Sequence, residues 1–186
     1  MKNIVFAGGT SLLAQCWIRD ENPDYNFILG IHNRKLDNKK WKTFIFNYED
    51  TSKLYSQLES LNVDILINCI GLTNVEDCEK NKKKALHSNA IIAKNISKVC
   101  MDLSIKMVHI STDHLFEGKR AFADEKTPIK PQNIYGKTKR EGESSCEFPE
   151  FGKVDKILQQ LSLRNLKYPV DADYGNTQDY IQINQF

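Results

Sequence analysis

The sequence has almost no excess of charge of either sign. Its 26 basic and 24 acidic residues leave a formal net charge of +2 across 186 residues. Proteins that bind nucleic acid usually present a strongly basic face, so no nucleic-acid partner is expected. The densest basic run, at residues 80–84, is better explained as the solvated start of a helix than as a polyanion site.

Long apolar runs and paired cysteines are missing as well. No window of about 18 apolar residues occurs, so we expect no membrane-spanning helix. Residues 1–3 lead directly into a strand-like run, which argues against a secretory leader. The chain has five cysteines, an odd number without a C-x-x-C pair: Cys16, Cys69, Cys78, Cys100 and Cys146. We therefore expect a cytoplasmic protein with reduced thiols, without a disulfide framework or a metal site.

What the chain does contain is an alternation of buried strands and helices. Short apolar runs predict strands at residues 3–7, 27–31, 43–46, 63–70 and 105–110. Helical periodicity follows at residues 12–17, 50–61 and 82–103, and a further helix is expected around Tyr135. This alternation predicts an α/β fold, a Rossmann-like doubly wound parallel sheet covered on both faces.

A glycine turn follows the first predicted strand directly. Gly8 and Gly9 precede Thr10 and Ser11, and a helix begins after them. Such a turn directs free backbone N–H groups and the positive end of the helix dipole at a site suited to a pyrophosphate. The spacing is imperfect, because Ser11 and Ala14 stand where a G-x-x-G-x-x-G pattern has glycines. A purely structural turn between strand and helix remains the alternative.

The end of the second predicted strand lacks an acidic residue. Between Gly30 and Lys35 there is no Asp or Glu, and Arg34 is present instead. An acidic residue here binds the ribose 2′-hydroxyl of NAD, whereas a basic residue accommodates the 2′-phosphate of NADP. The pattern favours NADP, although a surface turn that happens to be basic would look the same.

Two stretches carry the residue types of a carbonyl reductase. The predicted strand at 105–110 ends in Ser111, Thr112 and Asp113, and Tyr135 is followed four residues later by Lys139. On a helix these two side chains share a face, and a nearby ammonium favours the phenolate form of Tyr. A hydroxyl can then hold the substrate oxygen while Tyr transfers the proton. Chance spacing within a helix is the plain alternative.

Four segments together resemble the extended short-chain dehydrogenase/reductase superfamily, and within it the dTDP-4-dehydrorhamnose reductase branch. The segments that carry the resemblance are residues 68–76, 88–90, 109–118 and 128–143. The likeness covers roughly residues 1–145. It implies NADPH-dependent reduction of a 4-keto group on a nucleotide-linked deoxysugar, with that nucleotide sugar as the binding partner and a homodimer as one candidate assembly.

The resemblance also implies roles for individual residues. Thr112 would orient the keto oxygen, Tyr135 would act as the general acid, and Lys139 would bind the nicotinamide ribose. Asn89 matches the asparagine that completes the catalytic group, although a buried asparagine is often only a satisfied structural residue. The implied cofactor-binding residues are Tyr135 and Lys139 themselves, Gly8, Thr10, Ser11, Leu12 and Leu13 at the pyrophosphate, Arg34 at the 2′-phosphate, Asn47 at the adenine, and Ile70, Gly71 and Leu72 beside the nicotinamide. The implied substrate-binding residues are Thr73, Val75 and His114.

The chain departs from this branch at His114 and in its last forty residues. His114 stands where the branch usually has Tyr, so either the sugar differs or this is a core histidine. From Cys146 onward the sequence does not align with the expected strand and substrate lobe. We expect a Rossmann-like NADP-binding domain at 1–147 and a divergent segment at 148–186, which either replaces the substrate lobe or belongs to a longer chain from which a segment is absent.

Two other functions stay open at this point. One is a non-catalytic regulatory subunit that keeps the dinucleotide-binding fold, which the altered glycines and the divergent end would suit. The other is a sugar-nucleotide epimerase or dehydratase, since these share the Tyr and Lys pair. Fold alone does not decide among them, because function resides in the site. A cation site at Asp171, Asp173 and Asp179 has no second cluster of ligands to support it.

Overall fold

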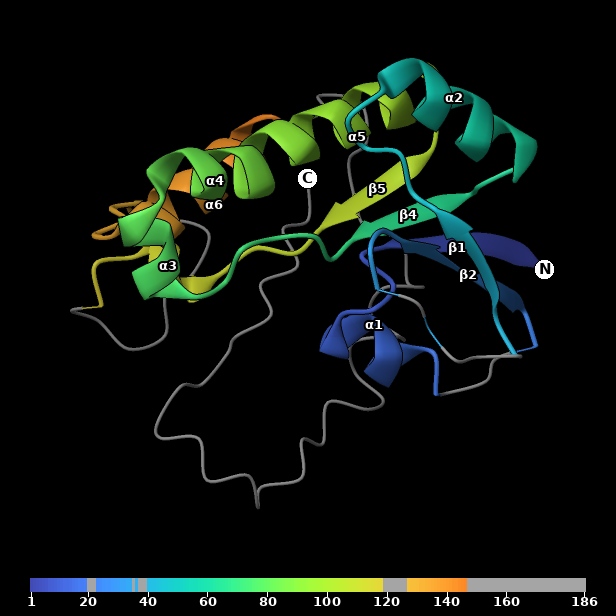
Figure 1. Ribbon diagram of the computed structural model, residues 1–186, viewed down its shortest axis with the longest axis horizontal. Coiled ribbons are helices and arrows are strands. Elements are labelled where there is room, and N and C mark those ends of the chain that lie inside the picture. Colours follow the sequence, from blue (N-terminus) through green and yellow to red (C-terminus); the bar gives the residue numbers. More distant parts are fainter. Residues whose placement is uncertain (20–22, 35, 37–39, 119–126, 147–186) are drawn as a thin grey trace.

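The structure, a computed structural model, describes residues 1–19, 23–34, 36, 40–118 and 127–146. Within these residues five parallel strands form one sheet in the order β3-β2-β1-β4-β5 (Figure 1). The strands are β1 (Lys2–Ala7), β2 (Tyr25–Ile31), β3 (Lys42–Ile45), β4 (Ile65–Asn68) and β5 (Lys106–His109). The chain moves outward from β1 to β3 and then returns to β4, so the strand order reverses between β1 and β4. Ligands of such sheets bind beyond the carboxyl ends of the strands at that reversal.

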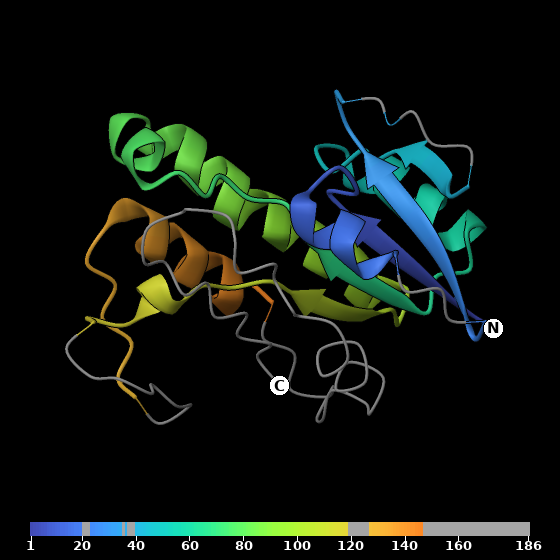
Figure 2. The ribbon, with the colours of Figure 1, turned by 90° about the horizontal axis from the view of Figure 1, so that it is seen from below.

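Helices cover both faces of the sheet, as predicted. The longer helices are α2 (Thr51–Ser60), α5 (Ile92–Asp102) and α6 (Ile134–Ser144). The shorter ones are α1 (Leu12–Trp17), α3 (Val75–Lys80), α4 (Lys82–Leu86), the π-helical turn η1 (His87–Ile91) and the 3₁₀ turn η2 (Asp113–Leu115). Figure 1 shows α2 and α5 on one face and α1 on the other, and α6 lies alongside α4 and α5 in both ribbon views (Figure 2).

The core lies on both faces of the sheet, because buried apolar side chains along each strand point alternately to one face and to the other. In β1, Ile4 and Phe6 pack toward α1, whereas Val5 and Ala7 pack toward α2 and α5, and all four are fully buried. Because successive side chains point to opposite faces, one strand serves two hydrophobic layers. The near-continuous apolar runs in the sequence are the pattern that such a doubly covered strand requires.

The prediction of one long helix at residues 82–103 needs correction. The chain there is helical throughout, but η1 interrupts α4 and α5 with hydrogen bonds that span five residues, as from the Ile92 N–H to the His87 carbonyl. A π turn carries one extra residue, which shifts the helix face. Helix α3 was not predicted, and it begins where the Asn74 side chain accepts a hydrogen bond from the Asp77 N–H at 2.8 Å.

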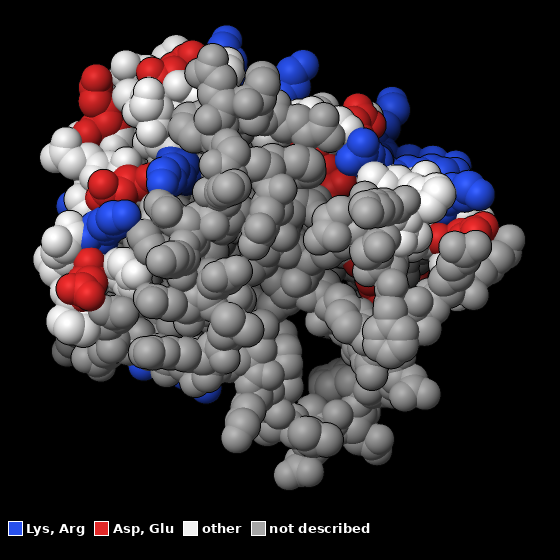
Figure 3. Space-filling model, turned by 180° about the vertical axis from the view of Figure 1, so that it is seen from behind, with Lys and Arg blue, Asp and Glu red and all other residues white. Residues whose placement is uncertain are grey.

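The basic run at 80–84 is solvent-exposed, and the Asn81 side chain caps the start of α4 by accepting from the Lys84 N–H at 3.0 Å. This confirms the prediction of a solvated helix start. In Figure 3, basic and acidic side chains of the described part lie close together on the face shown.

The described residues also bear on the predictions about membrane-spanning helices, metal-binding clusters and disulfides. No helix among the described residues is long and apolar enough to cross a membrane. Within the same residues, no group of three or more His, Cys, Asp or Glu side chains is arranged to hold a metal ion. All five cysteines are unpaired. The proposed segment at 148–186, with its three aspartates, lies outside the described residues, as do residues 119–126 of the loop before α6.

Candidate active site

The glycine turn joins β1 to α1 at the point where the strand order reverses. Gly8 has a positive φ of 83°, and a Cβ on Gly9 would lie only 2.7 Å from the Cβ of Leu29, so both positions favour glycine. The N–H groups of Gly8 and Gly9 both donate to the Gly30 carbonyl, at 3.2 and 2.8 Å. These two N–H groups are therefore used inside the fold rather than free for a ligand.

The backbone N–H groups that remain free are the next ones along. No described residue accepts a hydrogen bond from the N–H of Thr10, Leu12 or Leu13. Ser11 is the N-cap of α1, and its Oγ accepts from the Ala14 N–H at 3.2 Å, while Ala14 is fully buried. The two residues that replace glycines therefore cap the helix and fill the core. The turn stays compact and offers free donors.

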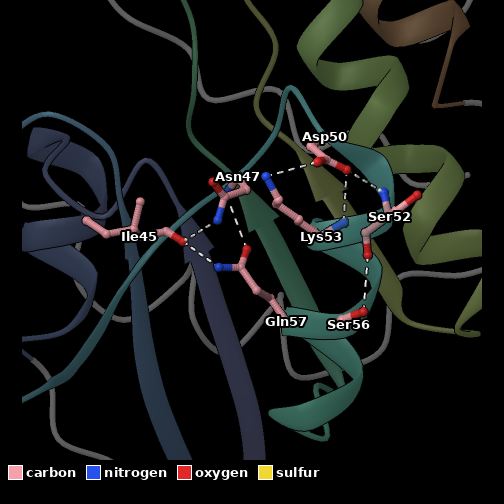
Figure 4. A network of polar contacts seen from close by, with 7 residues as sticks. All are labelled: Ile45, Asn47, Asp50, Ser52, Lys53, Ser56 and Gln57. Carbon is pink, nitrogen blue, oxygen red and sulfur yellow. Dashed lines mark hydrogen bonds and ion pairs between the residues drawn. The ribbon is translucent and has the colours of Figure 1, made fainter.

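The carboxyl end of β2 presents polar and aromatic groups beside the same turn. Arg34 is exposed, and the His32 ring packs against the Tyr48 ring with centroids 4.9 Å apart. Asn47 follows β3, and its Nδ2 donates to the Ile45 carbonyl at 3.3 Å, an oxygen that also accepts from the Gln57 side chain at 2.7 Å (Figure 4). The side chain of Asn47 is thus already engaged in fixing its own loop.

The start of α2 is fixed in the same region. Asp50 caps this helix by accepting from the N–H groups of Ser52 and Lys53, both at 3.1 Å (Figure 4). The backbone N–H of Lys53 is the main reason that the pKa of the Asp50 carboxyl lies below its usual value. The loop between β3 and α2 is therefore held in one conformation next to the strand ends.

The segment that follows β4 carries the three residues expected beside the nicotinamide. Ile70 lies directly against the glycine turn, since a Cβ on Gly8 would lie 3.2 Å from the Ile70 N atom. Its N–H donates to Oδ1 of Asn68 at 3.0 Å. Leu72 is held by Asn89, whose Oδ1 accepts from the Leu72 N–H at 2.7 Å and whose Nδ2 donates to the Leu72 carbonyl at 3.1 Å. Gly71, between these two anchors, is solvent-exposed.

Tyr135 and Lys139 lie one turn apart on the buried face of α6, with exposed fractions of 8% and 5%. The Lys139 Nζ donates to the Ile110 carbonyl at the end of β5 and lies 4.0 Å from where a Cβ on Gly71 would be. Burial lowers the pKa of Lys139 from 10.5 to about 8, although the carboxylate of Glu143 favours the charged form. The structure thus brings Lys139 of the predicted pair close to the segment 70–72 and to the residue that follows β5.

Thr112 and His114 complete this group at the beginning of α6. The Thr112 Oγ1 accepts from the His114 N–H at 3.3 Å and donates to the Asp113 carboxylate at 3.3 Å. The half-buried His114 ring meets the Tyr135 ring edge-on, with centroids 5.3 Å apart. Asn133 caps α6 through its Oδ1, so its Nδ2 donates to the His114 Nδ1 at 2.9 Å. This bond assigns the proton of a neutral His114 ring to Nε2.

A second polar pair lies behind Lys139 and had no sequence prediction. Because the Asn68 Oδ1 is taken by the Ile70 N–H, its Nδ2 donates to the His109 Nδ1 at 3.0 Å. Burial, reinforced by the positive charge of Lys139, holds the pKa of His109 well below 6.5. The His109 Nε2 and the Ser111 Oγ are buried and have no hydrogen-bond partner among the described residues. Burial likewise raises the pKa of the Cys69 thiol to about 12, so this thiol is protonated.

The printed contacts thus join the glycine turn after β1, the segment 70–72 after β4 and the residues after β5 to α6, whereas Arg34 and Asn47 lie after β2 and β3. Thr73 is exposed just after the Leu72 anchor, and Val75 is the first residue of α3. Sequence reasoning missed four residues whose side chains hold this group: Asn68, His109, Asn133 and Thr138. A signal existed only for Asn68, a polar residue at the end of an otherwise apolar run.

Comparison with known proteins identifies the family. The model described as "RmlD substrate binding domain" matches residues 2–150. The probable low-salt glycan biosynthesis reductase Agl14 of Haloferax volcanii is 28% identical over 180 residues, which cover 96% of this chain and 57% of that protein. The dTDP-4-dehydrorhamnose reductase of Mycolicibacterium smegmatis is 36% identical over 90 residues, 45% of this chain and 26% of that protein.

Solved structures agree with this result. The dTDP-4-dehydrorhamnose reductase of Bacillus anthracis, in complex with NADP, has a TM-score of 0.66 at 28% identity. The match covers 78% of this chain and 49% of the Bacillus chain. The UDP-Glc/GlcNAc 4-epimerase of Campylobacter jejuni, at 18% identity and a TM-score of 0.71, covers 89% of this chain and 50% of its own and shares the fold. This chain spans about half the length of the Haloferax and Bacillus relatives. With a match over residues 2–150, the chain belongs to the RmlD substrate binding domain family, as its resemblance to dTDP-4-dehydrorhamnose reductases implied.

Proposed function

We propose that this chain carries the cofactor and acid–base part of an NADPH-dependent reductase that acts on the 4-keto group of a nucleotide-linked deoxysugar. The observation that carries the proposal is the placement of Tyr135 and Lys139 on the buried face of α6, beside the segment that Asn89 anchors. Relatives named as sugar-nucleotide and glycan biosynthesis reductases support the reaction class.

The residues at the glycine turn suit a dinucleotide. Thr10, Leu12 and Leu13 offer backbone N–H groups with no acceptor among the described residues, which fits a pyrophosphate. Arg34 would bind the 2′-phosphate, with Asn47 near the adenine. The nicotinamide would lie beside Gly71, where the absence of a side chain lets the segment 70–72 lie close to the Asn89 Oδ1, 3.1 Å from where a Cβ would be. When bound, NADPH supplies the hydride that reduces the carbonyl carbon.

Residues of this chain would then orient the keto oxygen and donate the proton to it. Thr112 would orient the keto oxygen by turning its hydroxyl from Asp113 to the substrate. Tyr135 would donate its phenolic proton to that oxygen as the carbonyl carbon is reduced. The Lys139 ammonium would stabilise the negative charge that develops on the phenol oxygen, and its further N–H groups would hold ribose hydroxyls.

The cofactor preference can be tested by titration. We expect NADPH to bind more tightly than NADH, because the Arg34 guanidinium pairs with the 2′-phosphate. Replacing this residue by an acidic one, Arg34→Glu, should shrink or reverse the preference, whereas Arg19→Glu, an equal charge change at another exposed position, should leave it intact. Equal affinities of the unaltered protein for the two cofactors would contradict the role given to Arg34.

The substrate class can be tested with a panel of nucleotide sugars. dTDP- and UDP-linked 4-keto-6-deoxyhexoses, each with NADPH, would show turnover by loss of absorbance at the nicotinamide band. Turnover with a member of this panel is expected. Binding of NADPH without oxidation by any member would argue for the regulatory alternative instead.

A further inference from the structure

The side chain of Asn89 has no donor left for a substrate. It is fully buried, and its amide carries two N–H groups. One donates to the Leu72 carbonyl at 3.1 Å and the other to the Thr138 Oγ1 at 3.0 Å, while its Oδ1 accepts from the Leu72 N–H at 2.7 Å. Asn89 therefore links two parts of the site, the segment after β4 and helix α6.

Thr138 is oriented to receive this contact. Its hydroxyl has a single proton, which is shared between the carbonyls of Ile134 and Tyr135 at 2.9 and 3.0 Å in the preceding turn of α6. The oxygen lone pairs then face Asn89, so the hydroxyl accepts rather than donates there. Thr138 is 6% exposed and lies between Tyr135 and Lys139 in the sequence of the same helix.

The close approach of α6 to η1 makes this bond feasible. A Cβ on Gly142 would overlap the backbone carbonyl of Asn89, so only glycine lets the two helical segments meet there. The π turn contains Asn89 at its centre. Asn89 thus contacts α6 twice, through its backbone carbonyl at Gly142 and through its side chain at Thr138.

We propose that Thr138 is a positioning residue that, through Asn89, fixes the nicotinamide-side segment 70–72 relative to the helix that carries Tyr135. This inference rests on the proposed function, because it assumes that a nicotinamide lies between that segment and α6. It extends the proposal by assigning a role to a residue that neither contacts the substrate nor supplies a proton.

The test compares Thr138→Val with Thr138→Ser in the full chain. Valine has nearly the same shape but no acceptor, so the buried Asn89 N–H loses its partner, whereas serine keeps the hydroxyl. Amide hydrogen exchange at Leu72 reports the anchor directly. The affinity ratio between NADPH and 2′-phospho-ADP-ribose, which lacks the nicotinamide, reports whether the segment holds that ring.

In Thr138→Val we expect exchange at Leu72 to accelerate and the NADPH advantage to fall, each roughly three- to tenfold, the range that one buried hydrogen bond supports. Thr138→Ser should stay close to the unaltered protein. Asn89→Ala should show the same losses, and adding Thr138→Val to it should add little, since both remove one linkage.

Ser97→Ala is the matched control, because the buried Ser97 Oγ donates to the Ser145 carbonyl at 2.8 Å and so also ties α5 to the end of α6. It should leave both readouts unchanged. The inference is overturned if Thr138→Val alters neither readout, or if Ser97→Ala alters both equally. If the unaltered protein binds NADPH no better than 2′-phospho-ADP-ribose, the nicotinamide part is wrong, and exchange at Leu72 alone decides whether the anchor exists.

Discussion

At the scale of single residues, the site depends on the ammonium group of Lys139, which is buried where a charged group is disfavoured. Lys139 is 5% exposed, and burial lowers its pKa from 10.5 to about 8. At neutral pH it is therefore still protonated. The proposed role of Lys139 needs that charge close to Tyr135. Burying the charged ammonium lowers the free energy of unfolding.

This predicts a pH-dependent effect of Lys139→Met on stability. Between pH 8 and 10.5 Lys139 is mostly protonated in the unfolded chain and mostly neutral in the folded chain. The free energy of unfolding therefore rises with pH across that window. Below pH 8 the penalty is complete; a shift from 10.5 to about 8 corresponds to about 3 kcal/mol. The methionine variant should be more stable than the unaltered protein at pH 7, and the gap should close by pH 10.5. Thermal melts at both pH values check this, and a gap that is constant with pH would refute it.

Local spacing explains which residues could be predicted. Tyr135 and Lys139 share a helical face, so the sequence alone places them together. The partners of Asn89 come from segments 17 and 49 residues away, and no local pattern reports them. Asn133 and His109 were missed for the same reason, since their roles arise only once β5 and α6 are packed.

At the scale of elements, the contact between η1 and α6 decides the geometry of the site. Strands and long helices followed from periodicity because each buries an apolar face. The π turn could not be predicted from periodicity, because the apolar residues before and after it also fit one uninterrupted helix. It lies where the Asn89 carbonyl approaches Gly142 on another helix, a contact that no local sequence pattern reports.

Gly142→Ala tests this contact. Alanine would favour the helix by about 1 kcal/mol at an open position. Here its Cβ would overlap the Asn89 carbonyl, and such overpacking costs typically about 1–3 kcal/mol, so the net effect should be destabilising. Ser144→Ala, an exposed position on the same helix, should be neutral or slightly stabilising. Urea unfolding measures both, and a Gly142→Ala variant at least as stable as Ser144→Ala would show that α6 and η1 do not meet this closely.

At the scale of the whole molecule, the parallel sheet gathers residues from distant segments at one edge. The reversal of strand order between β1 and β4 places the glycine turn next to the segment 70–72, and β5 brings Thr112 toward α6. Alternation of strands and helices was enough to predict the doubly wound parallel sheet, whereas the order of its strands is known only from the structure. This chain spans 57% of the Haloferax relative, so the sugar is proposed from the names of the relatives.

The most direct measurement is the comparison of Tyr135→Phe with the unaltered protein, in turnover and in NADPH affinity. Phenylalanine removes only the proton donor, so turnover with the nucleotide sugar should fall by about 10²- to 10⁴-fold while the Kd for NADPH changes little. A Tyr135→Phe protein that still reduces the sugar at a comparable rate would contradict the account, because the proton would then come from elsewhere.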